Sequence, residues 1–124
     1  MSDIALNESI TAADSESWYT VCKLSDLNPF MGVRALLHGK QIAIFMIRNS
    51  DEMYAIDAVD PFSGAAVLSR GIVGDIKGEL VVASPIYKQH FSLKTGICLE
   101  DNTVSVATYP VRVVDQKVQL ALDD

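Results

Sequence analysis

Apolar and polar residues alternate with a period of two along most of this chain, a pattern typical of half-buried β-strands. Glycine, proline, asparagine and aspartate interrupt the alternation at short intervals, and no long segment carries the apolar stripe of a helix. Many short strands separated by turns predict an all-β fold of small antiparallel sheets, either a sandwich or a small barrel. The expected strands are 18–24, 33–38, 41–47, 53–57, 80–83, 89–93, 97–100, 104–107, 111–114 and 117–122.

Two intervals depart from this pattern. Residues 1–16 are polar and acidic without a period, which predicts a disordered tail, so the folded domain is expected over 17–124. The interval 58–79 has 22 residues with four glycines and one proline. A connection of that length inside a β domain is uncommon and is often functional, so we look for a site there. The pattern leaves the path of 71–79 open.

Charge and composition exclude several classes of protein. The 124 residues carry a formal net charge of −6 without any basic run, which argues against a nucleic-acid binder. The longest uninterrupted apolar run, 42–47, is far shorter than the ~18 residues that a membrane span needs. The first residues have no basic region followed by an apolar block, so we expect no secretory signal. These features favour a cytoplasmic protein with reduced thiols.

The candidate metal ligands do not have the spacing of a metal site. Cys22, Cys98, His38 and His90 match the ligand count of a Rieske [2Fe–2S] cluster, but no cysteine lies within three residues of a histidine. Each pair of such ligands has to come from one loop. We therefore expect the cysteines to act as small hydrophobic residues, and His38 to be an exposed turn residue.

A hydrolase is not supported by the residues either. Ser63 or Ser84 could be combined with His90 and Asp60, but no Gly-x-Ser-x-Gly turn presents a nucleophile. Gly71 and Gly74 lack the spacing of a dinucleotide-binding loop. Residue chemistry alone thus predicts no catalytic centre in this chain.

Two segments nevertheless resemble the ligand loops of a Rieske ferredoxin domain, namely 55–71 and 82–96. The family pattern is Cys-x-His in the first loop and Cys-Pro-x-His-Gly in the second, followed by a Thr-Gly turn. In this chain the four ligand positions are occupied by Asp60, Phe62, Ser84 and Tyr87, and Lys88 replaces the glycine. Pro85, Phe91 and Thr95-Gly96 keep their places. The resemblance implies a Rieske-like fold with an inserted subdomain like the one that binds the cluster, but without metal ligands.

These loops are similar to one group within that family, the small subunit of assimilatory NAD(P)H-dependent nitrite reductase. The resemblance extends from Trp18 to Leu122. It implies a non-redox accessory subunit for an enzyme that reduces nitrite to ammonium in nitrate assimilation. Its partner would be the large subunit, which carries FAD, a [4Fe–4S] cluster and sirohaem, while this chain would have no cofactor. The alternative from another class is a stand-alone binding or regulatory module without enzymatic activity.

The loop tips are the expected site, and we assign them no catalytic role. Phe62 and Tyr87 are expected either to fill the volume of the missing cluster or to point outward as partner contacts. Asp60 is expected to accept backbone N–H bonds within its loop. The residues expected to be partner contacts or vestigial loop tips are Asp60, Pro61, Phe62, Ser63, Ser84, Pro85, Tyr87 and Lys88.

Overall fold

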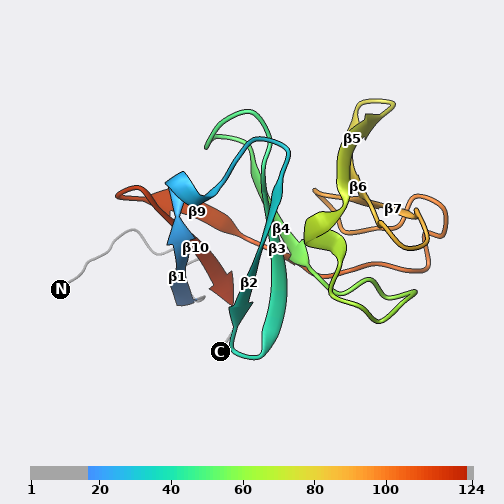
Figure 1. The fold of residues 1–124 in the computed structure, drawn as a ribbon, viewed down its shortest axis with the longest axis horizontal. Coiled ribbons are helices and arrows are strands. Elements are labelled where there is room, and N and C mark those ends of the chain that lie inside the picture. Colours follow the sequence, from blue (N-terminus) through green and yellow to red (C-terminus); the bar gives the residue numbers. More distant parts are fainter. Residues whose placement is uncertain (1–16, 123–124) are drawn as a thin grey trace.

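Three antiparallel sheets make up residues 17–122, the part of the chain that the computed structural model describes (Figure 1). Their strand orders are β1–β10–β9, β2–β3–β4–β8 and β5–β6–β7, which confirms the all-β fold class. The expected tail at 1–16 lies outside the described residues. The strands are β1 (Ser17–Lys23), β2 (Gly32–Leu37), β3 (Lys40–Met46), β4 (Met53–Asp57), β5 (Ile72–Ile76), β6 (Glu79–Ala83), β7 (His90–Ser92), β8 (Thr108–Tyr109), β9 (Val111–Val114) and β10 (Lys117–Leu122).

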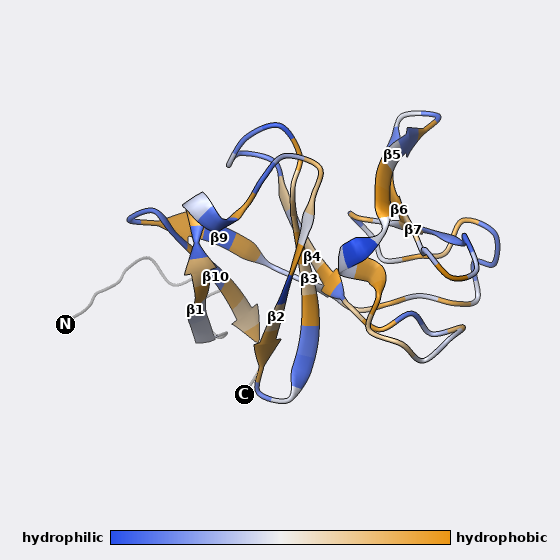
Figure 2. Cartoon of the chain, viewed as in Figure 1, coloured by the Kyte–Doolittle hydropathy of each residue, from blue (hydrophilic) through white to orange (hydrophobic). Residues whose placement is uncertain are grey.

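The four-stranded sheet is the middle layer, and residues 42–46 of its strand β3 are buried on both faces. Successive side chains of a strand point to opposite faces, so β3 contributes to two separate cores. Ile42 and Ile44 pack with Leu120 of β10 in one core. Ala43 and Phe45 lie in the other core, together with residues of the third sheet. This double burial explains why β3 is a continuous apolar run rather than an alternating one, as its colouring in Figure 2 shows.

The third sheet is an insertion into the middle sheet. Strands β4 and β8 are paired neighbours, with Ala55 opposite Tyr109, yet the chain between them forms β5, β6 and β7. In Figure 1 this inserted subdomain lies on the side of the middle sheet away from β1 and β10. Leu68, Val82 and Phe91 attach it to the middle sheet through their shared core. The expected inserted subdomain is therefore present.

The prediction was wrong in two parts of this subdomain. The long loop expected at 58–79 contains β5, which pairs with β6 through a two-residue turn at 77–78. Residues 97–100 and 104–107, expected as strands, form only isolated bridges, Phe91 to Cys98 and Ile97 to Ser105. Their backbone groups are satisfied by a folded loop instead, in which the Cys98 N–H donates to the Val104 carbonyl at 2.9 Å.

Helical structure among residues 17–122 is limited to two short 3-10 turns, η2 (Leu24–Asp26) and η3 (Leu68–Arg70). Neither comes near the length of a helix that could cross a membrane, and no other helix occurs in the described range. The η3 turn lies between the first ligand-like loop and β5, and it contributes the fully buried Leu68 to the core beneath both loops.

Candidate functional site

The first ligand-like loop follows β4 and is folded around Asp60, which is fully buried. The Phe62 N–H donates to Oδ1 of Asp60 at 2.8 Å, a local turn that aspartate side chains favour. The Gly64 N–H donates to the Asp60 carbonyl at 2.7 Å, which closes the loop. The expectation that Asp60 accepts an N–H bond within its own loop is confirmed at Phe62.

The second ligand-like loop joins β6 to β7 and is organised in the same way around Ser84, which is also fully buried. The Ile86 N–H donates to Oγ of Ser84 at 3.3 Å. The Lys88 N–H donates to the Ser84 carbonyl at 3.1 Å, and the Ser84 N–H donates to the Gln89 carbonyl at 2.9 Å. Lys88 has a φ of 68°, the left-handed conformation that favours the glycine of the Rieske pattern at this position.

A buried hydrogen bond joins the two loops. The Ser84 hydroxyl donates to Oδ2 of Asp60 at 2.6 Å, across 24 residues of sequence. These are the two positions at which the Rieske pattern has its cysteines. Both loops lie on the inserted subdomain, on its side away from β1 (Figure 1). A short charge-assisted bond between fully buried groups therefore cross-links the loops, where in a Rieske domain the cluster does so.

The histidine-equivalent positions are exposed. Tyr87 has 57% of its surface exposed, so of the two alternatives for its ring the structure favours the outward-pointing one. Phe62 has 37% of its surface exposed. Its ring makes a tilted contact with the ring of the buried Phe91, and the ring centroids are 6.2 Å apart. Phe62 thus covers the core edge without entering it. The two polar groups are thus buried between the loops, and the two aromatic rings lie at the surface.

The remaining loop-tip residues have local roles. Pro61 and Pro85 are exposed, and the half-buried Ser63 accepts the Ala65 N–H on its hydroxyl oxygen at 3.2 Å. The Lys88 ammonium reaches the Pro85 carbonyl at 3.4 Å within its own loop. Sequence analysis missed Ile86, an exposed apolar side chain at the tip of the second loop. Its position between a proline and an aromatic residue was the available signal.

Comparison with known proteins agrees with this geometry. The sequence model of the Rieske-like [2Fe-2S] domain matches residues 17–121. The nitrite reductase (NADH) small subunit of Salmonella typhimurium is 50% identical over 103 residues, which cover 83% of this chain and 95% of that protein. The chain belongs to the Rieske-like nitrite reductase small-subunit family.

Two further relatives extend the comparison. The NMR structure of the Escherichia coli protein NirD superposes with a TM-score of 0.81 at 46% identity, covering 88% of this chain and 99% of NirD. The nitrite reductase [NAD(P)H] large subunit of Klebsiella oxytoca is 40% identical over 107 residues, which are 86% of this chain and 11% of that protein. In the Klebsiella protein, a segment similar to this small-subunit chain is part of a much longer polypeptide.

The residues of this small-subunit chain do not fit a [2Fe–2S] cluster, although the family description names one. A Rieske cluster takes two thiolates and two imidazoles, whereas the equivalent positions offer a carboxylate and a hydroxyl already bonded to each other, and two aromatic rings. Cys22 and Cys98 lie in different parts of the fold, on β1 and beside β7. Burial raises the pKa of both thiols, which suits the expected role as small hydrophobic residues.

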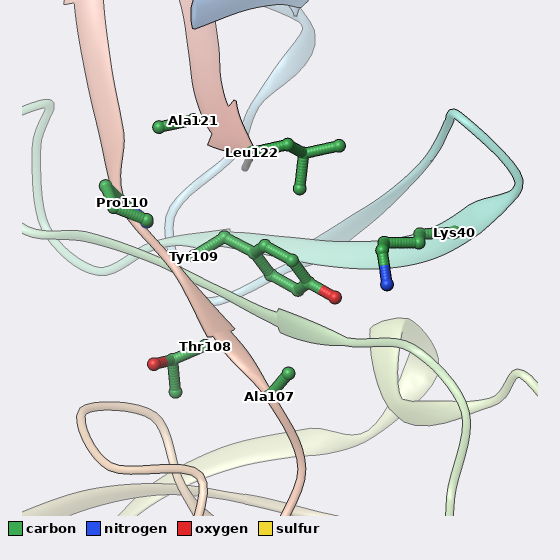
Figure 3. A pocket seen from close by; sticks show the side chains of 7 residues that line it. All are labelled: Lys40, Ala107, Thr108, Tyr109, Pro110, Ala121 and Leu122. Carbon is green, nitrogen blue, oxygen red and sulfur yellow. The ribbon is translucent and has the colours of Figure 1, made fainter. Parts of the chain in front are cut away.

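A pocket of about 290 Å³ lies away from the loop tips, where β8 meets β10 and the start of β3. The Tyr109 hydroxyl donates to Oδ1 of Asp57 at 2.6 Å, and burial together with this bond raises the pKa of Tyr109 above its ordinary value. Tyr109 therefore stays protonated at neutral pH and serves as a structural donor. Figure 3 shows the lining side chains, which are Lys40, Ala107, Thr108, Tyr109, Pro110, Ala121 and Leu122.

His90, at the end of the second loop, pairs with Glu100. Its Nδ1 lies 2.6 Å from Oε2 of Glu100, and its backbone N–H donates to Oε1 at 2.7 Å. Burial opposes ionisation of Glu100, but the bonds from His90 outweigh it and hold the pKa of Glu100 below its ordinary value of 4.5. The pair fixes the folded loop 97–107 against β7. The Cys98 thiol donates to Oε1 of Glu100 at 3.6 Å and is fully buried, so it belongs to the core beneath the pair.

A pH-dependent contribution to stability follows. Because the pKa of Glu100 is lower in the folded chain than in the unfolded chain, its contribution is present above pH 4.5 and is lost as the pH falls through the folded value. We expect Glu100→Gln to show a smaller drop in the free energy of unfolding between neutral and acidic pH, measured by urea titration. Glu79→Gln, at an exposed position on β6, controls for the lost charge. An equal drop in the free energy of unfolding for the wild type and Glu100→Gln would contradict the assignment of this pH dependence to Glu100.

Proposed function

We propose that this chain is the small subunit of a cytoplasmic NAD(P)H-dependent nitrite reductase and has a non-redox role. In this role it binds the large subunit, which holds FAD, a [4Fe–4S] cluster and sirohaem and reduces nitrite to ammonium. The similarity to the Salmonella small subunit along nearly its entire length supports the assignment. The chain itself would supply assembly or activation, not electron transfer.

One observation carries the non-redox part of the proposal, the hydrogen bond between Ser84 and Asp60. It occupies the positions of both cysteine ligands with groups that bind each other. The oxygens of this buried carboxylate are already hydrogen-bonded within the chain, so binding iron would break those bonds. Hydroxyl and carboxylate oxygens are also poor substitutes for the thiolates of iron–sulfur clusters. What remains of the Rieske site is a rigid pair of loops that can be recognised by another protein.

The test uses the purified large subunit and the purified full-length chain. We expect nitrite-dependent oxidation of NADH or NADPH by the large subunit to increase when the chain is added, and the two to elute together from a sizing column. The chain alone is expected to be colourless, with no iron–sulfur signal by EPR after reduction. Unchanged activity without co-elution would overturn the assignment as a subunit. A [2Fe–2S] spectrum from anaerobically purified chain would overturn the non-redox role.

A further inference from the structure

Three exposed apolar side chains gather at the tips of the two cross-linked loops, namely Phe62, Ile86 and Tyr87, with exposed fractions of 37%, 44% and 57%. We infer that this loop-tip surface, with Lys88 at its edge, is where the chain docks on the nitrite reductase large subunit. The inference rests on the proposed function and adds to it the face that is used and the chemistry of the partner's matching face.

The loop-tip surface is held in place from below by one hydrogen-bonded network. The Phe62 N–H is bonded to Asp60, the Ile86 N–H is bonded to Ser84, and the two acceptor side chains are bonded to each other. The backbone of both tips is therefore anchored to the same buried pair. Association loses less conformational entropy when the contacting side chains stand on a fixed backbone. Such preorganisation suits a binding surface, whereas unconstrained loops would have to be ordered on binding.

Charge distinguishes this surface from the rest of the molecule. The whole chain has a formal net charge of −6. Within 60–64 and 84–89 the charged residues are Asp60, which is fully buried, and Lys88, which is exposed. The loop tips thus present apolar groups and one positive charge on an acidic protein. The complementary face is an apolar depression with a carboxylate beside it, since unlike charges at the rim steer association.

The backbone conformation of Lys88 is a further feature of this surface. Its φ of 68° places a lysine in the left-handed conformation, which is strained for a residue other than glycine. The Rieske pattern has glycine at this position, which would relieve that strain. The side chain of Lys88 is exposed, and within residues 17–122 its ammonium makes a long 3.4 Å contact with the Pro85 carbonyl of its own loop. In an interface, this exposed positive charge beside the apolar side chains can pair with a carboxylate of the partner.

The large subunit is the occupant that the comparisons favour. In the Klebsiella large subunit, the segment matching this chain is 11% of one continuous polypeptide. The matching domain in that protein is covalently tied to the rest of the enzyme, so it stays beside it at all times. A separate chain with the same domain needs a surface that replaces this tether, and exposed aromatic residues are the usual energetic centres of such surfaces.

The experiment measures the dissociation constant between purified large subunit and variants of the full chain by isothermal calorimetry. We expect Tyr87→Ala and Ile86→Ser to weaken binding at least tenfold without lowering the melting temperature, because both side chains are exposed. Phe62→Ala should also weaken binding, with some loss of stability from its contact with Phe91. Lys88→Gly should weaken binding while keeping or raising the melting temperature, because it removes the ammonium and the backbone strain together.

The matched controls replace exposed apolar residues elsewhere in the fold. They are Met31→Ala, just before β2, and Leu36→Ala, on β2. Both are expected to bind within twofold of the wild type. If the wild type binds but the loop-tip variants bind equally well, or if the controls weaken binding instead, the docking surface is overturned and the proposed function stands. If the wild type does not bind the large subunit at all, the proposed function fails and this inference fails with it.

Discussion

Replacing Ser84 with alanine is expected to lower the free energy of unfolding by about 2–3 kcal/mol, measured by urea denaturation at neutral pH. The Ser84 hydroxyl donates to Oδ2 of Asp60 at 2.6 Å, and both residues are fully buried. The alanine variant leaves that carboxylate oxygen buried without its donor. A hydrogen bond to a charged group contributes more than a neutral one, and an unsatisfied buried charge adds a desolvation penalty.

Two further variants separate the pair from a general effect of losing a hydroxyl. Ser63→Ala removes a half-buried hydroxyl from the first loop, whose oxygen accepts only the local Ala65 N–H, and should cost less than about 1 kcal/mol. The double variant Asp60→Ala with Ser84→Ala should cost less than the sum of the single variants, because it leaves no buried charge behind. A Ser84→Ala variant as stable as the wild type would show that other contacts hold the loops together.

The strands before and after the inserted subdomain could largely be predicted from the sequence, because most of them have strong local signals. The β9–β10 hairpin is one example, since its turn at 115–116 separates the β-branched run 111–114 from the run 117–122, in which polar and apolar residues alternate at first. Strand β5 was missed because Gly74 and Asp75 interrupt a short edge strand, which among residues 17–122 pairs with β6 alone. Residues 97–100 and 104–107 have the composition of strands, but they form a folded loop against β7. Tertiary context decided both segments.

At the site, the positions could be predicted but not the directions of the side chains. The resemblance placed Asp60 and Ser84 at equivalent ligand positions, and the structure brings them within hydrogen-bonding distance. It could not tell that these two polar groups would be buried while the aromatic residues are exposed. Hydrophobicity alone suggests the reverse. The outcome depends on a pair that satisfies its own hydrogen bonds, which no single residue reveals.

The burial of Asp60 and Ser84 and the exposure of the aromatic residues show how a Rieske-like fold is held together without the four cluster ligands. Bulky side chains do not replace the cluster between the loops, because Tyr87 is more than half exposed and Phe62 stays at the core edge. The apolar core beneath, with Leu68, Val82 and Phe91, already supports both loops. A hydrogen bond suffices as the cross-link because it is buried and charge-assisted. The two aromatic residues therefore keep part of their surface exposed, on which the inferred docking surface depends.

Gly96→Ala is expected to destabilise the chain by about 3 kcal/mol or more, which is a large loss for one methyl group. Gly96 belongs to the Thr-Gly turn retained from the Rieske pattern, and its φ of 78° is left-handed. A Cβ there would clash with the backbone carbonyl of Val106, which cannot move easily because the Val106 N–H donates to the Gly96 carbonyl at 2.8 Å.

Gly39→Ala is the matched control, since its φ of 79° is similar but a Cβ would meet nothing within 4 Å. The control should cost only the left-handed penalty of roughly 1–2 kcal/mol. Equal costs for the two variants in urea titrations would mean that the contact with Val106 contributes nothing.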